Sequence, residues 1–281
     1  MKKVLAFLIL VLGVTALLNV PALAARAPAR VPSQLGNDIS WPQCGRKLPS
    51  GQAFGIVGVN GGIATTTNPC LADQLLWADN SSGAANQPKT QLYVNTANPG
   101  EIIDQVSTWP VNNTDKTGYT TDNPYGECTG QNDLACSWQY GWNRAVEDVI
   151  DRFAPAVNTT TLNNDPAAYV WWLDVEIVNT WQSGSGGALA RNAATLEGMT
   201  AHFQSKNAPV GIYSTSYQWG QIVGSAVDNN SNLNGLASWL AGARNEADAK
   251  KKCSLPPLTA GGKVALTQFV SRSYDYDYSC V

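Results

Sequence analysis

YVWWLDVE, residues 169–176, is the stretch that most decides the fold of this sequence. A short, continuously apolar run leads into two carboxylates, Asp174 and Glu176. Such a run is typical of a strand that is buried on both faces, as in a parallel sheet covered by helices. Side chains two positions apart on a strand point to the same side, so we expect Asp174 and Glu176 to face together and Val175 to face the helices.

Further short β-rich runs occur on both sides of this segment, at residues 38–41, 54–60, 91–95, 210–214, 238–241, 263–270 and 273–278. Helical patterns separate many of them, at 69–78, 137–153, 188–204, 246–252 and, more weakly, 216–225. This alternation predicts an α/β fold with a parallel sheet. Because the strands crowd together after residue 214, we expect a single-domain, TIM-like barrel of the irregular (β/α)5(β)3 type. The alternative is an open doubly wound sheet, but no G-x-G-x-x-G or phosphate loop supports it.

The first residues have the three parts of a secretory signal peptide. Lys2 and Lys3 precede an apolar run, and residues 21–24 (PALA) form a small-x-small cleavage site. We therefore expect a signal peptide at 1–24, an Ala/Pro-rich leader at 25–34, and a barrel domain at 35–281. An uncleaved membrane anchor is the alternative, although the run is slightly short for a span. The mature protein is expected to be secreted, without membrane association.

The composition favours a neutral polar ligand. Charged residues make up only 14% of the chain, the formal net charge is −3, and ten tryptophans are present. Scattered Lys and Arg in a mildly acidic protein argue against nucleic acid as a partner. Sugars are one class of neutral ligand that packs against aromatic faces, although most tryptophans are expected in the core. We expect a monomer that acts without a cofactor.

The six cysteines are expected to form disulfides outside the cell. Six cysteines allow fifteen pairings, and we prefer the sequential one: Cys44–Cys70, Cys128–Cys136 and Cys253–Cys280. No metal site is expected, because His202 is the sole histidine and the cysteines are widely spread. The long polar segment 96–135 is expected to be an ordered excursion above the barrel, fixed by Cys128–Cys136.

Carboxylates near the chain ends extend the acidic set. Asp38 lies in the first predicted strand, and Asp275 and Asp277 lie in the last. Closure of a barrel makes these strands neighbours, and the active face of a parallel barrel is at the carboxyl ends of its strands. Two close carboxylates in an apolar setting can divide into a proton donor and a charged group, as glycoside hydrolysis requires. The alternatives are a pair that caps a helix or binds Arg191, and a polar, exposed terminal strand.

Other catalytic chemistries have weaker support. A Ser-His-Asp hydrolase would depend on His202, which lies in a predicted helix, and no G-x-S-x-G is present. A cysteine nucleophile conflicts with the pairing of all six cysteines. The glycine-rich segment at 58–62 lacks the Lys and Ser/Thr of a P-loop, so we interpret it as a turn that brings Asn60 to the cleft.

An ordered set of short motifs resembles the family 25 glycoside hydrolases, the N-acetylmuramidase lysozymes. The motifs are G-x-D-x-S at 36–40, D-x-E at 174–176, GIYS at 211–214, WLA at 239–241 and QF at 268–269 before Asp275. The resemblance spans most of the mature chain and implies a barrel of five βα units followed by three strands. It also implies Glu176 as the general acid, with Asp174 stabilising the transition state or orienting an N-acetyl group and Asp38 completing the catalytic acids.

The expected substrate contacts are Asp275, Asp277, Asn60, Asn95, Tyr93 and Tyr213. Two positions depart from the family pattern: Asn95 stands where Tyr-His-Phe usually ends, and Asp277 where Asn is common. The export signal and the acidic set at the predicted strand ends together predict a secreted glycosidase that cleaves β-1,4 bonds in cell-wall peptidoglycan. The alternatives are a barrel that binds wall glycan without cutting it and a secreted surface protein with no glycan role.

Overall fold

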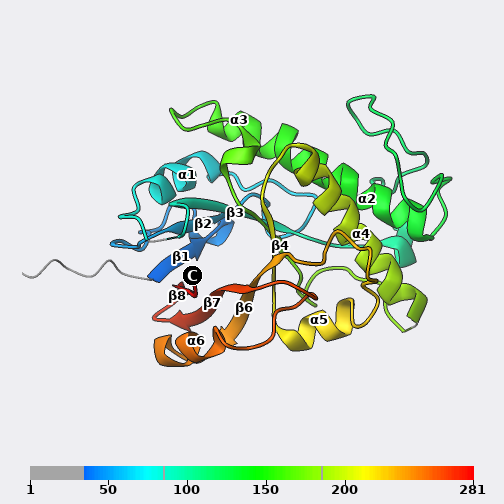
Figure 1. Ribbon diagram of the computed structural model, residues 1–281. Helices are drawn as coiled ribbons and strands as arrows, with labels where there is room; N and C mark the ends of the chain where they lie inside the picture. The colour runs from blue at the N-terminus through cyan, green and yellow to red at the C-terminus, as the bar shows by residue number, and fades with distance from the viewer. Residues whose placement is uncertain (1–34, 85, 185) are drawn as a thin grey trace, which may run out of the picture. The chain divides into compact units, whose positions relative to one another are not determined.

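The computed structural model describes residues 35–84, 86–184 and 186–281 (Figure 1). The expected signal peptide at 1–24 and leader at 25–34 lie outside the described residues. None of the described helices combines the length and the apolar character needed to cross a membrane.

The strands close into one barrel in chain order, which confirms the prediction of an eight-stranded α/β barrel. Neighbouring strands from β1 to β7 are parallel, and β8 is antiparallel to both β7 and β1. The strands are β1 (Leu35–Ile39), β2 (Gly55–Gly58), β3 (Thr90–Asn95), β4 (Trp171–Asp174), β5 (Val210–Ser214), β6 (Ala237–Ala243), β7 (Val264–Ser271) and β8 (Tyr274–Ser279).

Helices follow five of the strands, but not the first five. Within the described residues, β1 is followed by one 3-10 turn, η1 (Trp41–Gln43), whereas β6 is followed by a helix. The five helical connections therefore follow β2 to β6, as the helical patterns in the sequence predict, and one strand later than in the arrangement that the family resemblance implies. The helices are α1 (Leu71–Asp79), α2 (Leu134–Glu147), α3 (Ala154–Val157), α4 (Gly186–Ser205), α5 (Ser216–Ile222) and α6 (Glu246–Lys252), with 3-10 turns η2 (Gly100–Gln105) and η4 (Pro166–Ala168) and a π-helical turn η3 (Asp148–Phe153).

Alternation along the strands divides the core into two layers. Outward side chains such as Ile39, Leu92 and Leu173 pack with residues of the surrounding helices in the main hydrophobic cluster. Inward side chains, including Ile56 and Trp172, form a separate apolar cluster inside the barrel. The barrel interior below the strand ends is therefore filled by side chains.

A glycine makes room for the largest ring inside the barrel. A Cβ atom at Gly211 would lie 2.2 Å from the Trp172 ring, much closer than carbon atoms pack. The indole fills that space and donates from Nε1 to Gln91 Oε1 at 2.8 Å, so its buried N–H group has a partner.

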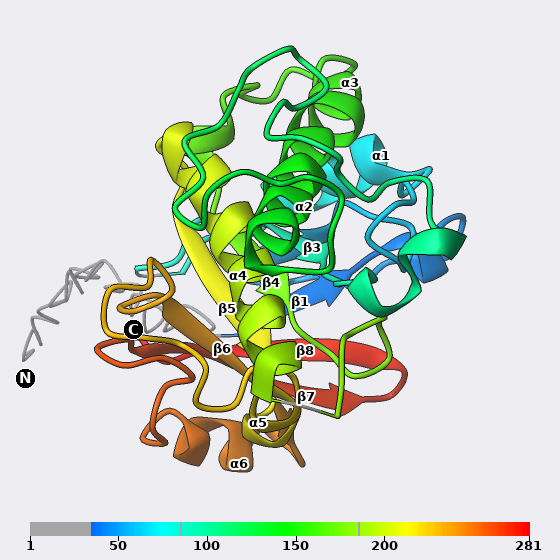
Figure 2. The same cartoon turned by 90° about the vertical axis from the view of Figure 1, so that its right-hand side faces the viewer.

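The segment at 96–135 begins at the strand ends and then leaves them. Figures 1 and 2 show that it continues along the outer side of α2 and α4. Trp142 of α2 donates to Asp115 at 3.0 Å, and Tyr125 donates to Glu197 of α4 at 2.5 Å. The segment thus follows the expected course above the barrel only near residue 100. Its remaining residues cover α2 and α4, because its aromatic and polar side chains form hydrogen bonds with these helices.

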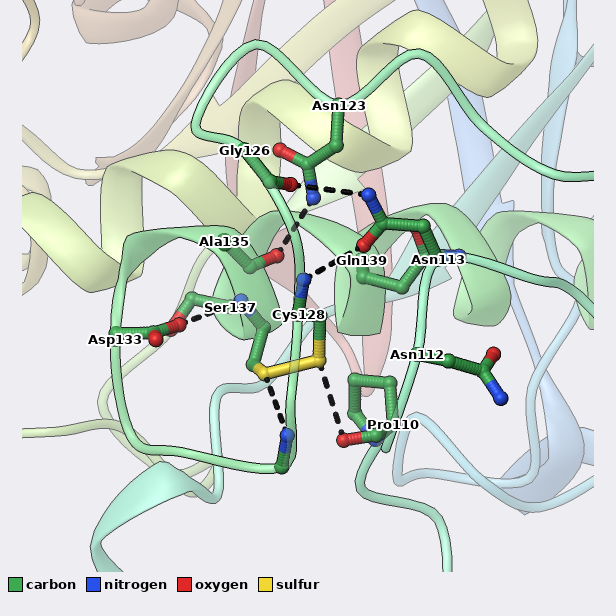
Figure 3. Close-up of a disulfide and its surroundings, with 12 residues drawn as sticks. Pro110, Asn112, Asn113, Asn123, Gly126, Cys128, Asp133, Ala135, Ser137 and Gln139 are labelled. Carbon is green, nitrogen blue, oxygen red and sulfur yellow. Dashed lines mark hydrogen bonds between the residues drawn. A yellow bond between two sulfur atoms is a disulfide. The ribbon is translucent and has the colours of Figure 1, made fainter.

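The disulfides follow the sequential pattern: Cys44–Cys70, Cys128–Cys136 and Cys253–Cys280. Figure 3 shows the second, which fixes the 96–135 segment to the start of α2. Asn113 accepts from Cys128 N at 2.9 Å, and Asn123 donates to the carbonyl of Ala135 at 2.8 Å. The disulfide and these two hydrogen bonds therefore stabilise the same part of the 96–135 segment, next to the start of α2.

Candidate active site

A cavity of about 300 Å³ opens at the carboxyl ends of the parallel strands. It brings together acids that are far apart in the sequence, since Asp38 on β1 and Asp275 on β8 lie directly opposite each other in the strand register. The lining consists of Asp38, Tyr93, Asp174, Glu176, Tyr213, Trp239, Gln268, Val270 and Asp275.

Asp174 and Glu176 both line the cavity but differ in their support. Asp174 ends β4 and is only 5% exposed, and its carbonyl accepts from Thr96 Oγ1 at 2.6 Å. Glu176 lies beyond the strand, which is shorter than predicted, and it is half-buried. Gln218 of α5 lies 3.5 Å from Glu176 Oε1 and also accepts from Ile177 N at 2.8 Å. Both carboxyl groups therefore face the cavity, Asp174 from an enclosed position and Glu176 from a more exposed one.

A chain of side-chain hydrogen bonds orients Asp38. Gln268 on β7 donates from Nε2 to Asp38 Oδ2 at 2.9 Å. Tyr213 on β5 donates its hydroxyl proton to Gln268 Oε1 at 2.9 Å, which fixes the amide orientation. Asp38 is therefore held as a hydrogen-bond acceptor at the cavity wall.

The crowding of acids raises their affinity for protons. Burial, followed by the charge of Asp275, raises the pKa of Asp38 to about 7. Burial and the neighbouring Glu176 and Asp38 raise the pKa of Asp174 well above its ordinary value. Burial and Glu176 also raise the pKa of Asp275. The cavity consequently retains protons under conditions in which isolated carboxyl groups are ionised.

Two phenols complete the polar wall as hydrogen-bond donors. Burial and the charge of Asp38 raise the pKa of Tyr93 well above its ordinary value, and burial and Glu176 do the same for Tyr213. Both hydroxyl groups therefore stay protonated. Tyr93 can donate to an acceptor oxygen of a ligand, whereas Tyr213 already donates to Gln268 and can accept from a ligand hydroxyl group.

Three expected substrate contacts lie outside this lining. Asn60 is fully buried, where it donates to Asp148 at 2.8 Å and accepts from the backbone N–H group of Asn95 at 2.7 Å. Asp148 also pairs with Arg152 at 2.9 Å, so Asn60 ties the ends of β2 and β3 to the end of α2. Asn95 is 8% exposed and does not line the cavity, and Asp277 is fully buried below it. The expectation of cleft contacts for Asn60, Asn95 and Asp277 is corrected accordingly.

The structure adds cavity residues that the sequence did not single out as a site. In the sequence, Gln268 and Trp239 stand out only as parts of short motifs, and Val270 only as the last residue of a predicted strand. Alternation along β7 gives the one available signal, since Leu266, Gln268 and Val270 share a face. Gln218 had no such signal, because its contact with Glu176 depends on how α5 packs.

Exposed apolar side chains follow the carboxyl ends of several strands, at the end of the barrel where the cavity opens, and one of them, Val270, lines the cavity. Trp41 follows β1, Ile177 and Val178 follow β4, Tyr217 begins α5 after β5, and Val270 lies at the end of β7. The position of Trp41 is specific: Gly62 has φ +98, and a Cβ atom there would lie 2.5 Å from Trp41 Nε1. Only glycine allows the indole to lie so close to this turn. We call these exposed residues at the cavity end of the barrel the rim.

Other cavities do not combine these features. A larger one, about 450 Å³, lies between the 96–135 segment, α4 and the α5–β6 loop. Its central carboxylate, Glu197, already accepts from Tyr125 and Ser231 at 2.5 Å each. His202 lies on α4 at a third cavity; burial lowers its pKa to about 4, and its ring packs edge-on to Trp142 at 4.9 Å. Among the described residues, no His/Cys/Asp/Glu group has the geometry of a metal site.

The fold and site define an α/β barrel with an acid-lined cavity at the carboxyl ends of its parallel strands. Residues 151–250 match the family model described as lysozyme-like protein 1. The match contains Asp174, Glu176, Tyr213 and Trp239. No curated protein matches the chain.

Two solved structures of XacCel5A, one of them in complex with cellopentaose, are similar to the chain at 10% identity. They cover 70% and 72% of this chain, each with a TM-score of 0.29. The chain spans 54% and 56% of their lengths, about half. A likeness at this level carries no conclusion about the site.

Proposed function

We propose that this protein is a secreted glycoside hydrolase that cleaves β-1,4 bonds in cell-wall peptidoglycan. The observation that carries the proposal is the convergence of Asp38, Asp174, Glu176 and Asp275 on one cavity at the strand ends. The lysozyme-like match over 151–250 and the three disulfides support the glycan substrate and the extracellular setting.

In this proposal Glu176 is the general acid. Its carboxyl group lies at the more open side of the cavity, where a glycosidic oxygen can reach it. It gives a proton to that oxygen as the bond to the sugar C1 carbon breaks. Asp174, enclosed beside it, stabilises the positive charge on the sugar ring or orients the N-acetyl group of the substrate.

The charge state of Asp174 depends on the substrate. In the free protein, burial and the Glu176 charge favour the protonated form of Asp174. Positive charge that develops on a sugar ring next to Asp174 favours its ionised form instead, because opposite charges stabilise each other strongly in a dry site. Asp174 is then the charged partner of the sugar ring while Glu176 donates its proton to the leaving oxygen.

Release of reducing ends from purified peptidoglycan tests this assignment. Wild-type protein should generate them, and Glu176→Gln should reduce the rate by about 10²- to 10⁴-fold, as expected for loss of a general acid. Glu246→Gln is the matched control, because Glu246 is an exposed carboxylate in the first turn of α6. The control should retain wild-type activity, and all three proteins should unfold at similar temperatures.

Two results would contradict the proposal. Equal activity of Glu176→Gln and wild type would remove Glu176 as the acid. Retention of wild-type protein on peptidoglycan, with no reducing ends at any pH between 4 and about 8, would instead identify a glycan-binding barrel without hydrolytic activity.

A further inference from the structure

Asp277 is a carboxyl group inside the barrel that the proposed reaction does not use. It is fully buried one layer below the cavity, on the same face of β8 as Asp275. Its strand neighbours are Gly36 on β1 and Gln268 on β7. Within the described chain, neither of its carboxyl oxygens receives a hydrogen bond from a donor group.

The surroundings of Asp277 do not compensate a negative charge. The Trp239 indole faces Asp277 and slightly lowers its pKa, but its Nε1 atom makes no hydrogen bond of acceptable geometry that would compensate a charge. The remaining groups around the cavity are acids, phenols and neutral side chains: Asp38 and Asp275, Asp174 and Glu176, Tyr93 and Tyr213, and Gln268. No Lys or Arg is among the residues that line the cavity. A buried carboxylate without a cation or donor is strongly unfavourable, so Asp277 holds a proton.

The acceptor for that proton is Asp38. The two carboxyl groups interact directly, and Asp38 is otherwise bonded on Oδ2 by Gln268. We propose that Asp277 is a positioning residue, a permanently neutral acid that donates a hydrogen bond to Asp38 and thereby holds Asp38 as an ionisable acceptor facing the cavity. The role of Asp38 in cleavage rests on the proposed function, whereas the hydrogen bond itself does not.

The electrostatics agree with this geometry. Burial, with the charges of Asp38 and Asp275, raises the pKa of Asp277 well above its ordinary value. The bonds from Gln268 and Asp277 lower the pKa of Asp38 and partly offset its burial, so that it is about 7. Loss of the Asp277 donor would therefore raise the pKa of Asp38 further.

Titration of the Asp38 carboxyl carbon by NMR, assigned with Asp38→Asn, tests the inference without any activity measurement. Asp277→Asn keeps a neutral donor, so the pKa of Asp38 should stay within about half a unit of wild type. Asp277→Leu keeps a similar volume but removes the donor, so the pKa of Asp38 should rise by about one to two units. Amide spectra and melting curves report whether each variant folds.

The direction in which the pKa of Asp38 shifts in each variant distinguishes a neutral Asp277 from a charged one. A charged Asp277 would make Asp277→Asn lower the pKa of Asp38 markedly, because a negative neighbour is lost. That result would overturn the proposal, as would an unchanged Asp38 pKa in folded Asp277→Leu. If Asp277→Leu does not fold, the sign found for Asp277→Asn decides alone.

Activity provides an independent readout. The acidic limb of the kcat/KM profile against pH, along which activity rises as Asp38 ionises, should be unchanged in Asp277→Asn and move to higher pH in Asp277→Leu. The opposite movement would contradict the positioning role. Absence of hydrolysis in the wild type would count against the proposed function, while the NMR result would still decide the hydrogen bond.

Discussion

At the scale of single residues, Asp174 and Glu176 have different environments although only Val175 lies between them. The backbone of Val175 is fixed by β5: its N–H group donates to the Tyr213 carbonyl at 2.9 Å, and its carbonyl accepts from Ser214 Oγ at 2.7 Å. These two hydrogen bonds fix the backbone between the two carboxyl groups, so that Asp174 stays enclosed and Glu176 lies nearer the mouth of the cavity. A division of roles between neighbouring carboxyl groups therefore arises from backbone position as well as from side-chain chemistry.

Packing inside the barrel depends on a single missing side chain at Gly211. Gly211→Ala should lower the free energy of unfolding by about 1–3 kcal/mol, because the added methyl group overlaps the buried Trp172 ring. Urea unfolding measures this change. Gly220→Ala is the control, since a Cβ atom there has no neighbour within 4 Å and lies within α5. Equal stabilities of the two variants would contradict the tight packing at Gly211.

At the scale of elements, the disulfides stabilise two different regions. Cys44–Cys70 joins the turn after β1, which carries the rim residue Trp41, to the start of α1. Cys128–Cys136 joins the 96–135 segment to α2 and lies over the outer helices (Figure 3). One disulfide therefore supports the cavity mouth and the other supports the helical layer.

Replacing each pair by serines should separate these two effects. For loops of 8 and 26 residues, chain entropy predicts losses of about 2.5 and 3.5 kcal/mol in the free energy of unfolding. We expect KM for polymeric glycan to rise in the Cys44/Cys70 variant, because Trp41 loses its support, and to stay at the wild-type value in the Cys128/Cys136 variant. Steady-state kinetics below the melting temperatures measures the difference. Equal KM values would exclude Trp41 and its turn from glycan binding.

At the scale of the whole molecule, the buried acids couple stability to pH. Asp38, Asp174, Asp275 and Asp277 all have a pKa raised by folding. Such groups bind protons more tightly in the folded chain, so stability is greatest below the unfolded pKa and falls as pH rises through the folded value. For Asp38 this interval runs from 3.8 to about 7.

The melting temperature should therefore be higher at pH 6.5 than at pH 8, an interval in which buried His202, with its pKa lowered from 6.5 to about 4, contributes little. A rise on the order of 5 °C is expected, since one unit of pKa shift corresponds to about 1.4 kcal/mol and each kcal/mol to about 2–4 °C in a chain of this size. Scanning calorimetry measures it, and Asp38→Asn should reduce the difference. A melting temperature that rises with pH would show that the acids are not protonated in the folded state.

The barrel could be predicted from the sequence, because the patterns that indicate its strands and helices each lie within a short segment. The strand at Val210–Ser214 and the helix at Glu246–Lys252 have the predicted bounds, since buried apolar runs and a polar helix are read within a few residues. The convergence of Asp38 with Asp275 follows from closure of the first strand on the last. The location of Asn60 could not be predicted, because its partner Asp148 is 88 positions away in sequence. The path of the 96–135 segment likewise depends on tertiary contacts with Trp142 and Glu197.

The structure of Glu176→Gln with a peptidoglycan fragment bound is the most direct test of the acid-lined cavity as the site of cleavage. The substitution removes the proton donor but keeps the shape of the site, so an uncleaved glycan can be trapped. We expect the glycosidic oxygen within about 3 Å of the residue 176 amide, with the N-acetyl group next to Asp174. A glycan bound elsewhere, such as in the outer cavity beside Glu197, with the acidic cavity empty, would contradict the proposed function.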